Sequence, residues 1–268
     1  MENNADDTLV FLHIPKTAGR TLQEIMKRKY KPTEYILNMH SHLAQLDAMS
    51  DQKKRGLKYI QGHIAYGLHK KLPQNCRYFS IMRDPVDRVV SQYYYMKLLK
   101  DHPLHKEIID KKLSLKDYVN SGVSKEPCND QVRMISGSDG QDMLEVAKEN
   151  ISKHFYMVGL SEYFDETLLL LMKELGWRMA LYGNRNINKA RPRVREIDDE
   201  TLNTIKKCNA MDIELYGFVK EKLLERMVKG GDSFYRELKT FHKLNAPYSR
   251  FFSVIRSMKH MFSDNIGK

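Results

Sequence analysis

The chain has 268 residues, of which 41% are hydrophobic and 29% are charged, a composition that excludes an intrinsically disordered chain and predicts one domain over residues 1–268. The sequence contains no apolar run of about 18 residues, so we expect no membrane-spanning helix. The net charge of +11 favours anionic ligands, without choosing among nucleic acid, a nucleotide, a sulfated glycan and a membrane surface.

The N-terminus and the cysteines predict the cellular compartment. Residues 1–8 are acidic and lack the basic start and apolar core of a secretory signal. Cys76, Cys128 and Cys208 are widely spaced and odd in number, so they predict neither a disulfide framework nor a zinc cluster. We therefore expect a reducing, cytoplasmic setting, unless the chain belongs to a longer membrane-anchored protein.

The first predicted strand is the apolar run over residues 9–14, which ends at Pro15. A helix should follow the turn after it, because apolar residues recur there at helical spacing: Leu22, Ile25, Met26 and Tyr30. The turn between this strand and this helix has the sequence Lys16-Thr17-Ala18-Gly19, in which a small residue separates the Lys-Thr pair from the glycine. The motif is not a Walker A loop, in which the glycine comes before the Lys-Thr pair.

This turn predicts a site for phosphate or sulfate. The N-terminus of a helix presents unpaired N–H groups and partial positive charge, and we expect Ala18 and Gly19 to leave room for an anion beside the backbone. Lys16 adds a full charge, and the hydroxyls of Thr17 and Thr21 add donors. The plainer alternative is a turn with a solvent-facing lysine.

Two further strand ends carry polar side chains. Lys58 to Ile60 leads into Gln61-Gly62-His63, which places His63 at a strand edge. Residues 77–82 predict a buried strand that ends at Arg83, followed by a helix with Asp84 as its N-cap and Pro85 in its first position.

In a parallel sheet, ligands collect beyond the carboxyl ends of the strands. Arg83 and the Lys16 turn should therefore face one crevice, with Ser91 two turns into the helix after Arg83. A capped helix with a salt-bridging arginine is the alternative for this second motif.

The rest of the chain is predicted to be mainly helical. An amphipathic pattern covers residues 102–120 with a break near Ser114, and residues 155–160 form a strand followed by a helix that Ser161 caps. A basic loop over residues 185–195 precedes a helix that begins near Asp198. Residues 219–268 are expected to be a basic, helical C-terminal appendage with many aromatic side chains.

The two motifs together resemble those of a known enzyme family. HIPKTAGRT resembles the phosphosulfate-binding loop of sulfotransferases that use 3′-phosphoadenosine 5′-phosphosulfate (PAPS), and RDPVDRVVSQYYY resembles their 3′-phosphate-binding stretch. The sequence HIPKTAGRT is most similar to the loop of the carbohydrate sulfotransferase branch, which includes the heparan sulfate 2-O- and 6-O-sulfotransferases. The resemblance implies an α/β fold in a single domain, with a central, mostly parallel sheet flanked by helices, as in P-loop kinases.

The resemblance also implies roles for individual residues, with PAPS as co-substrate and no metal. Lys16 would contact the bridging oxygen, and the segment Thr17, Ala18, Gly19, Arg20 and Thr21 would hold the 5′-phosphate. Arg83 and Ser91 would hold the 3′-phosphate, and Lys189 and Arg191 in the basic loop are candidate phosphate contacts. Arg20 stands where the family often has Thr or Ser, so it contacts the sulfate or an anionic acceptor, or simply points to solvent.

The catalytic base is expected to be His63. The similar uronyl 2-O-sulfotransferases carry the base in a His-Gly-His segment, which here reads Gln61-Gly62-His63. Histidine titrates near neutral pH and suits this role. We disfavour His13, because we expect it to lie within the first strand. The implied reaction moves a sulfuryl group to an acceptor hydroxyl, most simply that of a carbohydrate.

Other functions remain open at this stage. A P-loop-type nucleotide or small-molecule kinase shares the expected fold and anion site, but it would need Mg²⁺ ligands and a Walker loop. A non-enzymatic polyanion-binding protein agrees with the charge and the aromatic tail, although nothing resembles a nucleic-acid module and we expect no specific nucleic-acid partner. A tyrosine, lipid or small metabolite also remains open as the acceptor. The compartment would be the Golgi lumen if the chain is part of an anchored enzyme.

Overall fold

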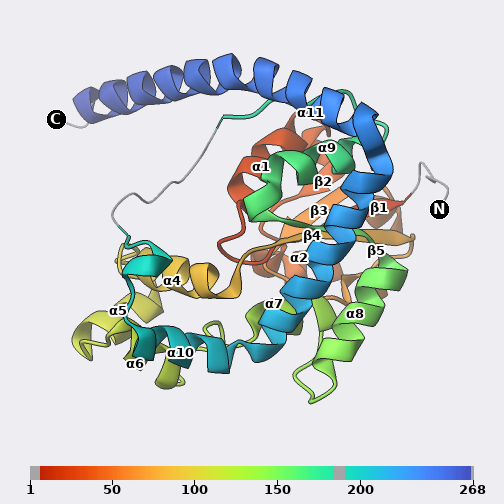
Figure 1. The fold of residues 1–268 in the computed structure, drawn as a ribbon. Helices are drawn as coiled ribbons and strands as arrows, with labels where there is room; N and C mark the ends of the chain where they lie inside the picture. Colours follow the sequence, from red (N-terminus) through yellow and green to blue (C-terminus); the bar gives the residue numbers. More distant parts are fainter. Residues whose placement is uncertain (1–6, 184–190, 267–268) are drawn as a thin grey trace.

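The computed structural model describes residues 7–183 and 191–266. Its centre is a five-stranded sheet with the order β2-β3-β1-β4-β5, in which every neighbouring pair is parallel (Figure 1). The strands are β1 (Thr8–Leu12), β2 (Tyr35–Ile36), β3 (Tyr59–Gly62), β4 (Cys76–Met82) and β5 (Phe155–Leu160). This arrangement confirms the expected α/β class and the parallel sheet.

Strand β1 is buried along its whole length and lies in the middle of the sheet. Strands of a parallel sheet are covered on both faces, which is why this segment reads as a continuous apolar run. Its last residue, Leu12, lies opposite Gly62 of β3 and Ser80 of β4. The carboxyl ends of β1, β3 and β4 are therefore close to one another at one edge of the sheet.

Helices surround the sheet and follow the strands along the chain. Asp84 accepts a hydrogen bond from the Asp87 N–H at 2.9 Å and begins α4, with Pro85 in its first turn, as expected. The helices are α1 (Gly19–Lys27), α2 (Leu43–Asp47), α3 (Asp51–Arg55), α4 (Pro85–Met96), α5 (Pro103–Asp110), α6 (Leu115–Asn120), α7 (Asp130–Ser136), α8 (Met143–His154), α9 (Phe164–Glu174), α10 (Asp199–Cys208) and α11 (Ala210–Ile266).

Two local expectations differ from the structure. The first strand ends at Leu12, so His13 lies just beyond it. Ser161 begins a short 3-10 helix, Ser161–Tyr163, and α9 starts after it without a side-chain cap. The break near Ser114 is confirmed, because Ser114 caps α6 and α5 ends before it.

The apolar core has two parts. The larger cluster surrounds the sheet, and a second one joins α4 to α5, α6 and α10 through Val89, Tyr118 and Ile205 (Figure 1). Helix α4 therefore connects the sheet to this outer group of helices. The apolar face of α4 packs into the second cluster. This packing fixes the start of α4, which directly follows Arg83 and Asp84.

The C-terminal helix α11 packs against the sheet before it extends away from it (Figure 1). Leu215, Val219, Phe234 and Phe241 are buried in the larger cluster. Gly231 interrupts its helical geometry with a φ of 54°. The expected start of an appendage at residue 219 thus falls inside this helix. Within the described residues, no helix has both the length and the apolar character needed to cross a membrane.

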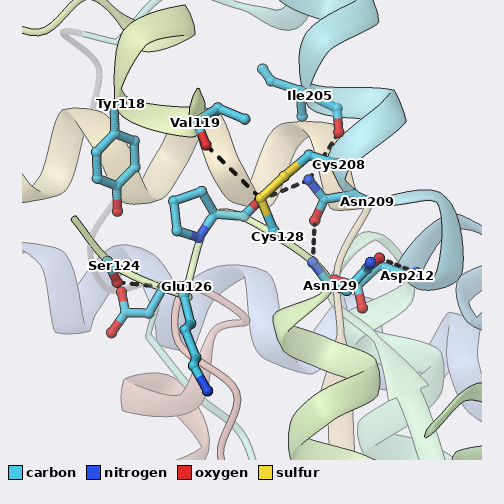
Figure 2. The surroundings of a disulfide bond; sticks show 12 residues. Tyr118, Val119, Ser124, Glu126, Cys128, Asn129, Ile205, Cys208, Asn209 and Asp212 are labelled. Carbon is cyan, nitrogen blue, oxygen red and sulfur yellow. Dashed lines mark hydrogen bonds between the residues drawn. A yellow bond between two sulfur atoms is a disulfide. The ribbon is translucent and has the colours of Figure 1, made fainter. Parts of the chain in front are cut away.

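Cys128 and Cys208 form a disulfide, so the expectation that the cysteines are unpaired is wrong (Figure 2). The two residues are 80 positions apart in the sequence, and their Cα atoms are 5.0 Å apart. The packing of α10 beside α6 brings them together, which the spacing of three cysteines does not reveal. Cys76 stays free.

The disulfide lies beside two helix N-termini that cap each other (Figure 2). Oδ1 of Asn129 accepts hydrogen bonds from the N–H groups of Met211 and Asp212, both at 3.1 Å, at the start of α11. The Asp212 carboxylate in turn accepts from the N–H groups of Gln131 and Val132 at the start of α7. Each helix start thus satisfies the donors of the other.

Loss of the disulfide should destabilise the fold. We expect Cys208→Ser to lower the free energy of unfolding by about 2–4 kcal/mol, because the link closes a long loop of the unfolded chain. Urea denaturation measures this change. A reducing agent should lower the stability of the unmodified chain to that of Cys208→Ser and leave the variant unchanged. An unmodified chain that unfolds identically with and without reductant would show that the disulfide does not form.

Candidate active site

A pocket of about 820 Å³ opens at the carboxyl edge of the sheet. Its lining includes Lys16 from the first turn, Arg83 and Ser91 from the second motif, and His63 from the end of β3. Nη1 of Arg83 donates a hydrogen bond to the Lys16 carbonyl at 2.9 Å. The structure thus brings the two sequence motifs into one site, as we expected from the parallel sheet.

The turn after β1 has an unusual backbone. Lys16 and Ala18 both take left-handed conformations, with φ of 73° and 66°. Such turns bring successive N–H groups together into a concave anion site, here at the start of α1. The hydroxyl of Thr17 is buried and donates to the Ile14 carbonyl at 2.8 Å. This hydrogen bond stabilises the turn and uses the hydroxyl proton of Thr17. The backbone N–H groups of the segment are then the groups that can bind an anion.

Gly19 is needed for a reason that the sequence did not reveal. A Cβ atom at this position would lie 1.9 Å from Nε2 of His13. The glycine thus admits the His13 ring beside the helix N-terminus, whereas we expected it to make room for an anion. Gln61 stabilises the same region, because its Nε2 reaches the Gly19 carbonyl at 3.5 Å and its Oε1 accepts from the Tyr59 hydroxyl at 2.7 Å.

Lys16 lies in a strongly positive part of the pocket. Burial and the nearby charges of Arg83, Arg20 and Arg191 lower the pKa of Lys16 to about 7. Its Nζ lies 3.5 Å from the centroid of the Tyr95 ring, whose face attracts a cation. The charge on Lys16 therefore depends on what else occupies the pocket, and an anion would favour the protonated form.

Two arginines meet at one carboxylate in the pocket wall. Asp87 accepts from Nε of Arg83 at 2.8 Å and from Nη2 of the same side chain, and Arg191 donates to both oxygens of Asp87. Burial alone would raise the pKa of Asp87, but the hydrogen bonds and charges of Arg191 and Arg83 keep it below its usual value. Asp87 thereby aligns two guanidinium groups. Lys189, the other expected contact in the basic loop, lies outside the described residues.

Gln131 is a site residue that the sequence analysis did not assign. Its side chain accepts from the Arg83 N–H at 3.0 Å and donates to the Arg83 carbonyl at 2.9 Å. It is fully buried at the start of α7. The backbone that carries Arg83 is therefore held on both sides by one amide. The segment Asn129 to Gly137 resembles an N-x-Q-x-R-x-L stretch of the glycan 6-O-sulfotransferases, but a polar helix face explained Gln131 equally well, so the sequence alone assigned it no role.

Three histidine rings, His13, His40 and His63, also line the pocket. The ring centroids of His13 and His63 are 4.4 Å apart, and those of His40 and His63 are 5.2 Å apart. Nδ1 of His63 lies 2.7 Å from the His13 carbonyl oxygen. Because a carbonyl only accepts, we assign the proton to Nδ1 of His63, which leaves Nε2 with a free lone pair.

The histidine cluster favours the neutral form of each ring. Burial lowers the pKa of His13 well below its ordinary value, and the neighbouring His63 and His40 lower it further. Desolvation also lowers the pKa of His63, with a smaller opposing effect from its hydrogen bond to His13. His63 is therefore a neutral ring with a free Nε2, the form that accepts a proton.

Comparison with known proteins places these features in a family. The model described as the sulfotransferase family matches residues 3–158, more than half of the chain. Galactose-3-O-sulfotransferase 2 of Mus musculus is 25% identical over 56% of this chain and 40% of its own length. Heparan sulfate 2-O-sulfotransferase 1 of Gallus gallus is 21% identical over 64% and 55%, and heparan-sulfate 6-O-sulfotransferase 2 of the same species is 22% identical over 82% and 68%.

The chain spans about half the length of the first two of these relatives. Among solved structures, a mouse sulfotransferase complexed with adenosine 3′,5′-bisphosphate (PAP) covers 76% of this chain and 63% of its own, with a TM-score of 0.43 and 14% identity.

The contact between Gly19 and His13 can be tested by stability. We expect Gly19→Ala to lower the free energy of unfolding by about 1–3 kcal/mol, because the added methyl group overlaps the His13 ring. In a His13→Ala background the same change should be neutral or stabilising, since alanine is the better helix former. Urea denaturation of the four proteins gives the coupling. Equal effects of Gly19→Ala in both backgrounds would contradict this packing.

Proposed function

The chain belongs to the sulfotransferase family, and we propose that it transfers a sulfuryl group from PAPS to a hydroxyl of a carbohydrate acceptor. The observation that carries the proposal is the shared pocket, which is lined by the Lys16 turn, by Arg83 and by the neutral His63. Relatives named for galactose and heparan sulfate support a sugar as the acceptor.

The pocket residues suit the two anionic ends of PAPS. The turn at Lys16, with its left-handed backbone and the N-terminus of α1, would hold the 5′-phosphosulfate. Arg83 and Ser91 would hold the 3′-phosphate, since a guanidinium fork and a hydroxyl match a phosphomonoester. Arg191 reaches the same carboxylate as Arg83 and would add a second fork.

The transfer needs a base, a positive charge and correct alignment. The acceptor oxygen forms a bond to sulfur while the bond from sulfur to the 5′-phosphate oxygen breaks, and PAP leaves. The hydroxyl proton passes to Nε2 of His63. Lys16 stabilises the negative charge that grows on the departing phosphate oxygen, by analogy with phosphoryl transfer.

The compartment is also a proposal. The Cys128–Cys208 disulfide supports an oxidising compartment, such as the Golgi lumen, over the cytoplasm that we expected from the sequence. The cytoplasmic expectation depended on cysteines that stay reduced. Trapping of free thiols in the protein isolated from its source would distinguish the two.

Transfer of labelled sulfate from PAPS to a panel of glycans, peptides and lipids tests the function. We expect His63→Ala to reduce turnover by about 10²–10⁴-fold, because it removes the base, while the affinity for PAP stays nearly unchanged. His242→Ala, at an exposed position on α11, serves as the control. Full activity of His63→Ala would exclude it as the base. Binding of ATP·Mg without binding of PAP would instead favour a kinase.

Binding of PAP should be coupled to proton uptake. Lys16 has a pKa of about 7 in the free protein, and the anionic nucleotide should raise it. At pH 8 the protein should therefore take up roughly one proton at Lys16 on binding, and its affinity for PAP should fall as the pH rises above 7. Calorimetry in buffers with different ionisation enthalpies measures the uptake. Lys16→Met should abolish it and Lys97→Met should not. Equal binding enthalpies in all buffers would contradict the lowered pKa.

A further inference from the structure

Tyr95 is the last residue of the second motif, and the sequence analysis assigns it no role. It lies four residues after Ser91 and eight after Asp87 on α4. Residues at this spacing share one face of a helix, and all three line the pocket. One face of α4 therefore presents a carboxylate, a hydroxyl and an aromatic ring to the pocket.

Tyr95 contacts two cations of the first motif. Nζ of Lys16 lies 3.5 Å from the centroid of the Tyr95 ring. The face of an aromatic ring is negative and attracts a cation, most strongly where water is excluded. The Tyr95 hydroxyl accepts a hydrogen bond from Nη2 of Arg20 at 3.2 Å. One side chain of α4 thus contacts the charged ends of two residues from the turn and the start of α1.

Lys16 is held at both ends by the second motif. Its carbonyl accepts from Nη1 of Arg83 at 2.9 Å, and its ammonium group lies over the Tyr95 ring. A flexible chain of four carbons separates these two contacts, and by itself it would let the charge take many positions. Arg83 therefore fixes the backbone from which the side chain starts, and Tyr95 fixes the charged group at its end.

Burial and positive neighbours oppose the charge on Lys16. Burial is the main cause of its lowered pKa, and nearby guanidinium groups lower the pKa further. These groups come from three segments of the chain and belong to Arg83, Arg20 and Arg191. The face of the Tyr95 ring acts in the opposite direction, because it favours the protonated form of the amine. The ring therefore offsets part of the effect of burial and of the arginines.

The other titratable groups of the pocket add little positive charge and already have partners. Burial lowers the pKa of three lining histidines, and the charge of Lys16 is a minor cause for one of them, His13; the other two are His40 and His63. The acidic side chains in the described lining are Asp87, Glu126 and Glu162. Asp87 pairs with two arginines, Glu126 accepts from the Gln92 amide, and Glu162 accepts from the Asp84 N–H.

We propose that Tyr95 is a positioning residue, which holds the Lys16 ammonium group in its charged form inside the pocket before the nucleotide binds. This inference rests on the proposed function for the identity of that nucleotide. When PAPS or PAP binds, an anionic group of the nucleotide replaces the ring as the partner of the ammonium. A lysine that is already protonated then needs to take up less of a proton near neutral pH.

The charge of Lys16 can be measured directly by a pH titration of the full chain with isotope-labelled lysine, followed by NMR. The spectrum of Lys16→Met identifies the Lys16 signal. We expect a titration midpoint of about 7 in the unmodified chain. Tyr95→Leu should move this midpoint down by about 0.5–1.5 pH units, because leucine fills the space without a negative face. Tyr95→Phe keeps the ring and should stay within about 0.3 pH units of the unmodified chain.

Binding of PAP gives a second readout. Calorimetry at pH 7 in buffers of different ionisation enthalpy should show uptake of about half a proton by the unmodified chain and of about 0.8–1 proton by Tyr95→Leu. Titration of the phosphates of PAP is the same for every variant and cancels in the comparison. Tyr94→Leu is the matched control, because Tyr94 packs against the second core cluster and is not among the described residues that line the pocket.

Each outcome decides one level of the proposal. Tyr95→Met is a second variant without a ring and should shift the midpoint as Tyr95→Leu does, so the comparison does not depend on the folding of one variant. An unchanged midpoint in both, or an equal shift in Tyr95→Phe, overturns the role of the ring and leaves the sulfotransferase function in place. The expected shifts without any binding of PAP overturn the proposed function and the nucleotide part of this inference.

Discussion

The hydrogen bond from the Arg83 guanidinium to the Lys16 carbonyl joins the two anion-binding segments of the molecule. It is possible because β1 and β4 are parallel neighbours that end at the same edge of the sheet. Like charges then lie close together in the pocket, which lowers the pKa of Lys16 to about 7. Asp87 offsets part of this repulsion by pairing with Arg83 and Arg191. The pocket is in this way prepared for a ligand of high negative charge.

The position of Arg83 depends on residues far away in the sequence. Gln131 holds its backbone on both sides, and the N-terminus of α7 that carries Gln131 is capped by Asp212 of α11. Asn129 caps α11 in return, next to the Cys128–Cys208 disulfide (Figure 2). The disulfide therefore supports the anion site as well as the outer helices. An anion site formed by two separate segments benefits from such rigid support.

The pocket combines cationic side chains with neutral histidine rings. The pocket carries the cations of the anion motifs and also His13, His40 and His63, whose pKa values are lowered by burial and, to a smaller extent, by neighbouring histidines. A base must be neutral to accept a proton, so the cluster suits that role near neutral pH. The cations of the two anion motifs and the histidines therefore line one pocket.

The sequence by itself predicted the turn after β1 and the capped start of α4, because these follow from local patterns of apolar residues, prolines and caps. The resemblance of two motifs to a known family implied the mostly parallel sheet, at whose carboxyl edge Lys16 and Arg83 were expected to converge. Two short motifs also indicated the sulfotransferase family, and the Gln61-Gly62-His63 segment suggested His63 as the base. Only the tertiary structure decided that Gly19 admits the His13 ring, that Gln131 holds Arg83, that Cys128 pairs with Cys208 and that Glu126 lines the pocket. Each of these contacts joins segments whose proximity depends on how helices pack, and local spacing along a chain carries no information about such packing.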